Sequence, residues 1–566
     1  MSEVGRRAVT PLTAWSKAEE GGAGRAVSQL PAESQEVRGT EVGGPEDLIC
    51  RGIFQIEKRS CDVVLTSSRL KWTPIEPESL ADDDKMISQH KMVSVDMKEV
   101  FAVKMKRRRS AGQQRGGTLL GITIFVCIKK GQNKLKDRAI HLSNLSEDYC
   151  NIWFKYLKDI LNGYFPKRPK FLKIIINPHS HKKEAKQVYY EQVAPLFKLA
   201  DIKTDITITE HEGHAFSVLK ECDIQAFDGV VCVGGDGTAS EVAHGLLLRA
   251  QTDARRDIDS NFMPVRAPLP LGIIPAGSTN VLSFSVHGIK HPCTAAMHII
   301  MGNLQAVDVC SFSSRHRLLR FGFSAMFGFG GTTLALAEKY RWMPSNQRKE
   351  FAVIKALTNL KPEDCELSFL PTENAHMADQ KGKRNEDERN TIEQCNEDKW
   401  QTMQTHFLNI SVMAIPCLCS MAPRGLAPNT RLDNGSMSLI AVQNSSRADF
   451  IKHLKRYGNR QNQFDFPFVE TYTVQEVKIR SKIDCGWTDM ESEENADFHS
   501  RHQSVISPKG SCPWNVDGDL MEGTSEVHIK IHPQLITMYG RNIEEFDDHT
   551  VKCSCLKSLG SGHTRT

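Results

Sequence analysis

The sequence Gly-Gly-Asp-Gly at residues 234–237 limits the fold more than any other stretch of this chain. It directly follows the apolar run 229–233, which is typical of a buried strand, and helical spacing begins at Thr238. Glycine lets backbone N–H groups approach a bound anion closely, and the start of a helix attracts negative charge. We therefore expect a phosphate-binding loop in which Asp236 is the carboxylate nearest to the ligand.

Predicted strands and helices alternate on both sides of this loop. The strands are 171–176, 206–208, 229–233 and 271–274, and the helices are 182–199, 213–221 and one from Thr238. This alternation is the pattern of a doubly wound, Rossmann-like α/β domain, here over residues 168–304. Ligands bind at the carboxyl edge of such a sheet. The loop 275–280 offers hydroxyl and amide groups at the same edge.

The second half of the chain has a different pattern of predicted elements. Residues 305–540 contain mostly strand-like runs and are predicted to form a β-sandwich domain. Polar stretches near 372–398 and 489–511 read as disordered insertions, and residues 541–566 read as a flexible tail. Trp-Asn-Val-Asp-Gly-Asp at 514–519 places two acids on a turn. Since Asp-Gly is itself a strong turn signal, a plain hairpin turn is the alternative.

The N-terminal part has two sections. Residues 1–44 have few large apolar residues and are predicted to be a disordered tail. Residues 45–165 read as short strands followed by one amphipathic helix, with Ser146 as its N-cap and Gly163 just past its end. Antiparallel strands closed by a helix with a central Trp153 resemble a pleckstrin-homology (PH) domain, a β-barrel. The resemblance implies docking to an anionic lipid headgroup, and a protein-contact or purely structural module is the alternative.

A basic cluster lies inside this region, in a stretch that we expect to be a loop. It consists of Lys104, Lys106, Arg107, Arg108 and Arg109. Such a cluster can act as a nuclear-import signal or bind the phosphates of an anionic membrane surface. A solvated, charged loop is the third interpretation.

Composition excludes several classes of protein. Lys+Arg number 72 and Asp+Glu 68, so a net charge of +4 argues against a general nucleic-acid binder. The longest apolar run, 119–128, is about half of the ~18 residues that a membrane span needs. The first 24 residues lack the apolar stretch of a signal peptide, and the 16 cysteines are scattered singly. We therefore expect an intracellular, cytoplasmic protein with reduced thiols.

The motifs, taken in this order, resemble the diacylglycerol kinase catalytic family, which includes the sphingosine and ceramide kinases. The segments similar to ceramide kinases are 231–237, 272–279, 424–428 and 462–470. Residues 177–184, Asn-Pro-His-Ser-His-Lys-Lys-Glu, are closer still to a divergent, ceramide-kinase-like branch of this family.

The resemblance implies a two-domain lipid kinase that uses ATP and Mg. Asp236 would take the proton from the lipid hydroxyl, and Asp517 would be the second catalytic acid. The implied nucleotide contacts are Asn177, Pro178, His179, Thr209, Glu210, His211, Glu212, Gly213, Glu241, Gly277, Ser278, Thr279, Arg341, Arg348, Gly518 and Asp519. The implied substrate contacts are Gly234, Gly235, Gly237 and Glu338. No further metal site is predicted, because His179 and His181 have no additional ligands near them in the sequence.

The chain departs from the family pattern in the segment that follows Asn177 and Pro178, where the family has a glycine-rich loop that binds phosphate; this segment, 177–183, is called the phosphate loop below. Ser180, His181 and Lys183 stand where the resemblance expects glycines. Their side chains would block the close approach of the backbone to a phosphate, and a positive φ costs such residues about 1–2 kcal/mol each. The basic side chains of Lys182 and Lys183 could still attract a phosphate, but they would position it less well.

The substrate segment departs as well. Thr332 and Leu336 occupy positions where ceramide kinases carry acids, so only Glu338 is left to hold the polar head of the lipid. The C-terminal Asp-Gly-Glu of the family is here Asp-Gly-Asp, with Asp519 one methylene shorter. Ordinary drift with activity intact is the alternative explanation of these departures.

The sequence thus predicts a lipid-kinase fold without significant ceramide kinase activity, which acts through lipid, nucleotide or protein binding at membranes or in the nucleus. The alternatives are an active ATP- and Mg-dependent kinase of a sphingolipid or related lipid alcohol, and a non-enzymatic scaffold. Expected partners are ceramide or a related sphingolipid, an anionic membrane surface and other proteins, but no nucleic acid. Nuclear and endomembrane pools would accompany the cytoplasmic one.

Overall fold

The computed structural model describes most of the 566-residue chain. The described residues are 47–75, 92–112, 116–180, 183–256, 263–315, 317–372, 400–459, 462–481, 513–521, 526–541 and 543. The predicted tails 1–44 and 541–566 and the predicted insertions near 372–398 and 489–511 lie almost entirely outside these residues. None of the described helices combines the length and the apolar character that crossing a bilayer requires.

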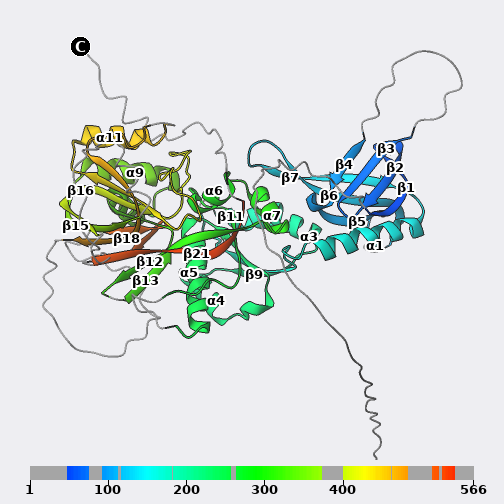
Figure 1. Ribbon diagram of the computed structural model, residues 1–566, viewed down its shortest axis with the longest axis horizontal. Helices are drawn as coiled ribbons and strands as arrows, with labels where there is room; N and C mark the ends of the chain where they lie inside the picture. Colours follow the sequence, from blue (N-terminus) through cyan, green and yellow to red (C-terminus); the bar gives the residue numbers. More distant parts are fainter. Residues whose placement is uncertain are drawn as a thin grey trace, which may run out of the picture. The chain divides into compact units, whose positions relative to one another are not determined.

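The first domain is a seven-stranded antiparallel sheet closed by one helix, α1 (Figure 1). Its sheet order is β4-β3-β2-β1-β7-β6-β5. The elements are β1 (Leu48–Ile56), β2 (Arg59–Thr66), β3 (Arg69–Pro74), β4 (Val93–Asp96), the 3₁₀ turn η1 (Met97–Glu99), β5 (Val100–Arg108), β6 (Thr118–Lys129), β7 (Leu135–Ser143) and α1 (Glu147–Tyr164). This is the predicted PH arrangement.

Helix α1 closes the barrel through its apolar face. The hydroxyl of Ser146 accepts the backbone N–H of Tyr149 at 3.4 Å, so the predicted N-cap is present. The Trp153 side chain is fully buried, and its ring meets the Phe54 ring edge-on, with centroids 5.0 Å apart. The helix continues through Gly163, so the predicted end is wrong. Nothing lies within 4 Å of the missing side chain of Gly163, and the helix tolerates a glycine there at the cost of propensity alone.

The second domain contains the parallel part of a larger sheet, in the order β11-β10-β8-β9. Its strands are β8 (Phe171–Ile176), β9 (Lys203–Ile208), β10 (Gly229–Gly234) and β11 (Leu271–Pro275). The helices are α2 (Ala185–Gln187), the π-helical segment η2 (Val188–Val193), α3 (Ala194–Leu199), α4 (His214–Glu221), the 3₁₀ turn η3 (Ile224–Ala226), α5 (Asp236–Asp253), α6 (Val281–His287) and α7 (Pro292–Ile300). These strands and helices confirm the predicted α/β layer.

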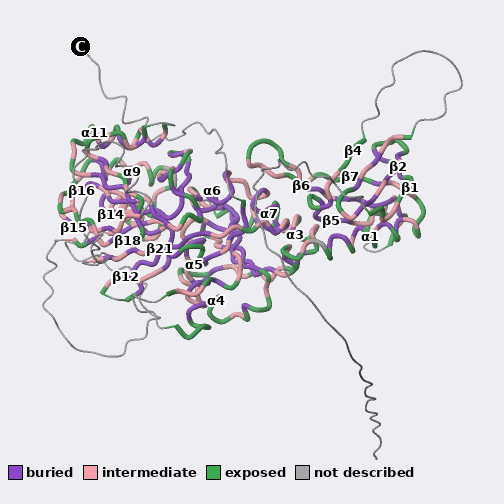
Figure 2. Tube along the Cα trace, viewed as in Figure 1, coloured by how far each residue is buried: buried purple, intermediate pink, exposed green. Residues whose placement is uncertain are grey.

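Both faces of the parallel strands β8, β10 and β11 are buried. Ile174, Ile176 and Val233 pack in one apolar cluster with residues of η2 and α7, whereas Ile175 and Cys232 pack in another with residues of α4 and α5. Side chains of a strand alternate between the two faces, so a continuous apolar run is what a sheet covered on both sides requires. In Figure 2 the buried, purple trace is concentrated in the strands near β21 and β11.

The third domain consists mainly of antiparallel strands. They are β12 (Leu304–Ser314), β13 (Arg317–Gly322), β14 (Ser324–Gly328), β15 (Glu363–Pro371), β16 (Gln401–Met413), β17 (Met437–Gln443), β18 (Val469–Ser481), β19 (Trp514–Val516), β20 (Asp519–Met521) and β21 (Glu526–Tyr539). Its helices are α8 (Phe329–Lys339), α9 (Ser345–Thr358) and α11 (Arg447–Arg456). An apolar cluster that includes Phe312, Phe407 and Trp514 fills the space between the strands.

Strand β21 joins the two parts of the large sheet. It pairs antiparallel with β12 and β18, and near its end Met538 pairs in parallel with Leu271 of β11. The last strand therefore completes the sheet of the second domain, although Met538 lies 267 positions after Leu271 in the sequence. Its position explains why the α/β layer and the sheet-rich domain share one continuous sheet.

Candidate active site

Four of the predicted ligand-binding segments follow the carboxyl ends of the four parallel strands. They are 177–179 after β8, 209–213 after β9, 234–237 after β10 and 277–279 after β11. Carboxyl ends of parallel strands lie at one edge of the sheet, which is where open α/β folds bind their ligands. The structure therefore brings these segments to the predicted edge.

Glycines allow the central loops to touch. A side chain on Gly277 would lie 2.4 Å from the Cα atom of Gly235, so only glycines fit at this contact. A side chain on Gly237 would lie 2.6 Å from a carboxylate oxygen of Asp519. The three motifs that the sequence singled out thus meet at the edge, including the Asp-Gly-Asp turn from the other end of the chain.

Asp236 is the first residue of α5, which begins two residues earlier than predicted because the extended backbone of Gly235 already serves as the N-cap. Its carboxylate accepts the backbone N–H of Leu282 at 3.0 Å, at the start of α6. Burial raises the pKa of Asp236 to about 6. A carboxylate with a raised pKa is a better proton acceptor, which is the property that a general base needs at neutral pH.

The carboxylate of Asp517 is held by four donors. Its carboxylate accepts the backbone N–H groups of Phe323 at 2.9 Å and Ser324 at 2.8 Å, and the hydroxyls of Ser240 at 2.9 Å and Ser324 at 3.0 Å. Burial raises its pKa, against the opposing effects of Arg320 and of these donors. Asp517 therefore joins the turn to strand β14 and helix α5, whatever it does in catalysis.

Asp519 is the acid of this turn that faces the loop 234–237. Arg320 on β13 donates to it at 3.2 Å and to the Ser240 hydroxyl at 2.9 Å. Burial raises the pKa of Asp519, and Arg320 opposes this rise. Sequence reasoning missed Arg320, since 199 residues separate it from Asp519 and no local motif surrounds it.

The phosphate loop after β8 forms hydrogen bonds within itself. The Asn177 side chain accepts the His179 backbone N–H at 2.9 Å and donates to the Thr238 hydroxyl at 2.9 Å. The backbone N–H of Ser180 donates to the Asn177 carbonyl at 3.3 Å, and that of Lys183 donates to the Ser180 carbonyl at 2.9 Å. Three amides of the loop are thus engaged inside it.

Lys183 has a strained backbone conformation. Its φ is +65°, in the left-handed region that favours glycine. Ser180 is buried, which the sequence did not predict, and residues 181–182 lie outside the described part of the chain.

Two other sets of predicted nucleotide contacts, Glu241 and residues 209–213, lie at the start of helix α4. One carboxylate oxygen of Glu241 accepts the backbone N–H groups of Ala215 at 3.0 Å and Phe216 at 3.3 Å, near the start of that helix. Gly213 precedes the helix with a φ of +80°. The backbone N–H of Glu210 donates to the His214 ring at 3.0 Å, and the His211 and His214 rings are stacked. The site residues here thus also build the local fold.

The substrate segment lies on α8 and continues toward α9. Glu338 forms an ion pair with Arg341, one turn further along. Arg348 donates to the backbone carbonyl of Arg341 at 3.4 Å, and its buried Nε has no partner in the described part of the chain. The one acid retained in this segment is therefore already paired with an arginine.

The loop after β11 is contacted by a residue that the sequence did not reveal. Lys349 on α9 donates to the hydroxyls of Ser278 at 2.6 Å and Thr279 at 2.7 Å. Lys349 comes from the third domain and the two hydroxyls from the second, and about 70 residues separate them. Only the folded structure reveals this contact.

The basic cluster lies largely on strand β5, not in a loop, so this prediction is wrong. Lys104 forms an ion pair with Asp201, which Lys158 of α1 also contacts at 2.6 Å. Arg107 forms an ion pair with Glu147. The remaining members are Lys106, Arg108 and Arg109, of which Arg108 and Arg109 are exposed. Part of the cluster thus stabilises the fold, and the rest faces solvent.

Comparison with protein families matches three consecutive models to this chain. The ceramide kinase PH domain matches residues 50–157, the diacylglycerol kinase catalytic domain 172–312, and the ceramide kinase C-terminal domain 323–556. A human ceramide kinase-like protein is 57% identical and covers 88% of this chain and 92% of its own length. Human ceramide kinase is 33% identical, over 80% of this chain and 89% of its own length. The chain belongs to the ceramide kinase family.

Within the ceramide kinase family, the catalytic-domain model covers the loops after β8, β9, β10 and β11. The Asp-Gly-Asp turn and Lys349 fall in the C-terminal-domain model. The candidate site is therefore assembled from both of these regions. Among solved structures, a putative diacylglycerol kinase of Bacillus anthracis has a TM-score of 0.44 and 15% identity, and covers 66% of this chain and 96% of its own.

Proposed function

We propose that this protein is a lipid- and nucleotide-binding member of the ceramide kinase family with lost or greatly reduced ceramide phosphorylation. The observation that carries the proposal is the phosphate loop. The backbone N–H groups of His179, Ser180 and Lys183 donate to acceptors inside the loop, so they do not point at a ligand. A kinase requires positioned phosphates, and small misplacements of the reacting groups cost large factors in rate.

The substrate segment supports the same proposal. Thr332 and Leu336 provide no carboxylate, and the carboxylate of Glu338 is paired with Arg341. A lipid headgroup would therefore compete with an arginine for the one acid in this segment. An ion pair that must be broken before a ligand binds lowers the affinity for that ligand.

An assay of the purified full-length chain with MgATP and ceramide tests the proposal. We expect no phosphate transfer above the level of Asp236→Ala, whereas MgATP raises the melting temperature because it binds only the native state. Human ceramide kinase serves as the positive control. Transfer that clearly exceeds the Asp236→Ala level would contradict the proposed loss of activity, and an unchanged melting temperature would contradict nucleotide binding.

An active ATP- and Mg-dependent lipid kinase is the second candidate, and one observation favours it. Asp236 keeps a raised pKa, of about 6, and Asp519 lies against Gly237 of the same loop. If MgATP binds, Asp519 would have to exchange its ion pair with Arg320 for the metal ion, which would neutralise phosphate charge. Asp236 would accept the proton of a lipid hydroxyl.

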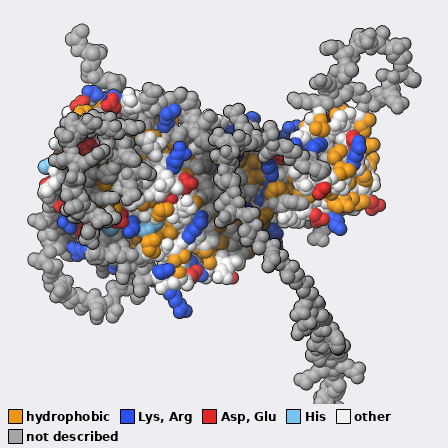
Figure 3. Space-filling model, in the orientation of Figure 1, with side chains coloured by type: hydrophobic (Ala, Val, Ile, Leu, Met, Phe, Trp, Pro, Cys, Tyr) orange, Lys and Arg blue, Asp and Glu red, His pale blue; other side chains and the backbone are white. Residues whose placement is uncertain are grey.

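The PH domain would bring the chain to anionic membranes. The face seen in Figure 3 carries hydrophobic side chains together with Lys and Arg. Exposed apolar residues of this domain include Ile53 on β1 and Ile152 and Tyr156 on α1, and Arg108 and Arg109 at the end of β5 are exposed as well. Apolar and basic groups together favour the surface of an anionic bilayer.

Flotation with phosphatidylserine vesicles tests the membrane role. Arg108→Gln with Arg109→Gln should reduce the floated fraction, because each basic residue near an anionic surface contributes about 1 kcal/mol. The same variant, followed by microscopy, tests a nuclear pool. An unchanged floated fraction and an unchanged nuclear share would show that the two arginines serve neither role, and Lys104→Gln, which breaks an internal ion pair, controls for effects on the fold.

A further inference from the structure

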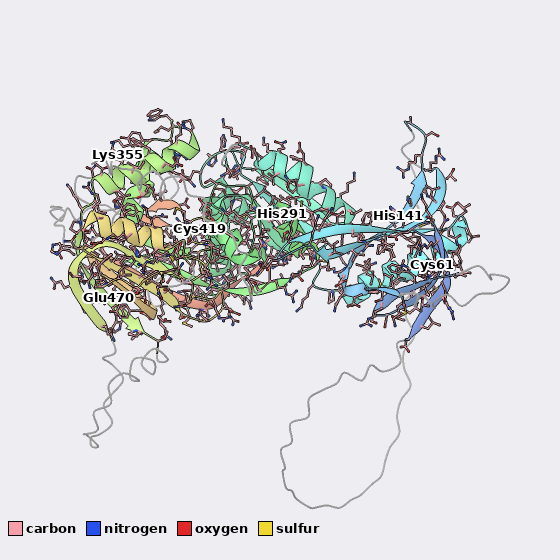
Figure 4. The ribbon with its side chains drawn as sticks, turned by 90° about the horizontal axis from the view of Figure 1, so that it is seen from above. Cys61, His141, His291, Lys355, Cys419 and Glu470 are labelled. Atoms are coloured by element: carbon pink, nitrogen blue, oxygen red, sulfur yellow. The ribbon has the colours of Figure 1, made fainter. Side chains whose placement is uncertain are left out.

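Lys349 and Lys290 are two cations that the family resemblance did not name. Lys349, on α9, donates to the hydroxyls of Ser278 at 2.6 Å and Thr279 at 2.7 Å. An ammonium has three N–H donors, so these two neutral acceptors fix its direction and leave one donor for a ligand. Lys355, labelled on the same helix in Figure 4, instead contacts the Tyr340 hydroxyl at 2.5 Å.

Lys290 adds a second ammonium to the group. It precedes α7, and its Nζ lies 5.8 Å from the centre of the Phe284 ring. The pKa of Lys290 is lowered by burial, while Cys419 and Asp236 oppose this effect. Cys419, labelled in Figure 4, is buried. Lys290 is therefore a partly desolvated cation that interacts electrostatically with Asp236.

The charges around Lys349 are unbalanced. Lys349 as a whole residue is exposed, but burial of its ammonium group lowers its pKa. The charge of Asp236 raises the pKa of Lys349, and the charges of Lys290 and Arg348 lower it further. In the described part of the chain, no carboxylate forms an ion pair with Lys290, Lys349 or Arg348. Lys349 and Lys290 thus share one nearby acid, Asp236, and a desolvated cation without a counter-ion is unfavourable until an anion binds.

We propose that Lys349 and Lys290 form a subsite for a phosphate monoester beside Asp236, with Ser278 and Thr279 orienting Lys349. The proposal rests on the proposed function and deepens it. The side-chain cations would do what the backbone of the phosphate loop no longer does. Their ligand is a terminal phosphate, carried either by a nucleotide or by the headgroup of a lipid. Lysine suits this role because it binds phosphate as a point charge.

The test uses the full-length chain and two probes. The first is AMP-PNP with Mg, measured by calorimetry, and the second is phosphatidylcholine vesicles that contain phosphatidic acid, measured by flotation. Lys349→Gln and Lys290→Gln should each weaken at least one of these interactions about tenfold, a factor equivalent to about 1.4 kcal/mol. The probe that responds identifies the source of the phosphate.

Three controls make the result specific. Lys349→Arg keeps the cation and should retain most of the affinity, and Lys339→Gln removes an exposed charge from the neighbouring helix α8 and should have no effect. Vesicles with phosphatidylglycerol present a diester in place of a monoester. The melting temperature of each unliganded variant shows whether it folds, and Lys290→Gln tests the subsite independently of α9.

The outcomes separate this proposal from the proposed function. If the wild-type chain binds a probe and both glutamine variants bind it equally well, the subsite is wrong and the binding function stands. If the wild-type chain binds neither probe, both proposals fail together. Weaker binding by the glutamine variants, with Lys339→Gln unchanged, supports the subsite.

Discussion

The two ends of the candidate nucleotide site differ in how they use the backbone. At the acid end, Gly235 and Gly277 touch through their Cα atoms, and Gly237 lies against Asp519. At the phosphate-loop end, side chains stand where glycines are expected, and Lys183 has a positive φ. The acid end thus has glycines where its close contacts require them, whereas the phosphate loop places a lysine in a conformation that favours glycine.

The acids at the first of these two ends also form hydrogen bonds that stabilise the fold, so they can be needed for the fold as well as for catalysis. Asp236 accepts the backbone N–H at the start of α6, and Asp517 accepts four hydrogen bonds from α5, β14 and the residue before β14. The presence of Asp236 and Asp517 is therefore weak evidence for kinase activity, because a chain without activity would still require them.

Asp517→Ala should have the largest effect. The substitution leaves the buried N–H groups of Phe323 and Ser324 without an acceptor, at a cost of about 1–3 kcal/mol each. We expect the free energy of unfolding to fall by about 3–5 kcal/mol in urea titrations. Asp519→Ala, on the same turn, removes one ion pair with Arg320 and should cost less than half as much. Equal losses would contradict a structural role specific to Asp517.

Asp236→Asn should change the free energy of unfolding by an intermediate amount, and it should stabilise the chain where Asp517→Ala destabilises it. Between the ordinary value of 3.8 and about 6, native Asp236 holds a proton that the unfolded chain has lost, so stability falls as pH rises through this window. At neutral pH the charged carboxylate is therefore unfavourable. Asparagine keeps an acceptor for the Leu282 N–H and should raise the free energy of unfolding by about 1–2 kcal/mol.

Thermal unfolding at several pH values measures this effect. The gain in stability from Asp236→Asn should be present at pH 7 and disappear below about pH 4. Below that pH the aspartate side chain is neutral, like asparagine, in both the native and the unfolded state. A gain that does not change with pH would show that the carboxylate of Asp236 is not the cause.

Lys183→Gly should have the smallest effect, at the other end of the site. Glycine relieves a positive φ that costs about 1–2 kcal/mol, and it adds about 0.5–1 kcal/mol of unfolded-state entropy. We expect a net gain of about 0.5–1 kcal/mol in urea titrations. Lys186→Gly, where the backbone is helical, should destabilise the chain instead. A loss of stability in Lys183→Gly would mean that the loop is not strained.

Local patterns predicted much of the architecture. The apolar runs of β8, β10 and β11 and the helical spacing of α1 identify their own structure, because side-chain periodicity is a property of neighbouring residues. The basic cluster was misread for a reason visible in the sequence. Lys104, Lys106 and Arg108 occur at every second position, which is the period of a strand, but their charge suggested a loop.

The contacts that complete the site could not be predicted in this way. Lys349 reaches Ser278 across about 70 residues, and Arg320 reaches Asp519 across 199. Such pairs depend on how whole domains pack, and no spacing rule within a window of the sequence relates them. The internal hydrogen bonds of the phosphate loop are an intermediate case, since the missing glycines indicated the change but not its geometry.

The path of β21 has a consequence for the way the protein is made. Strand β11 pairs with β10 on one side and gains its second neighbour only when Met538 has been synthesised, long after the rest of the α/β layer has left the ribosome. Until then one edge of that layer exposes unpaired backbone groups, and such edges promote aggregation. The newborn chain must therefore protect an open sheet edge through most of translation, and premature termination anywhere before β21 would leave that edge permanently uncovered.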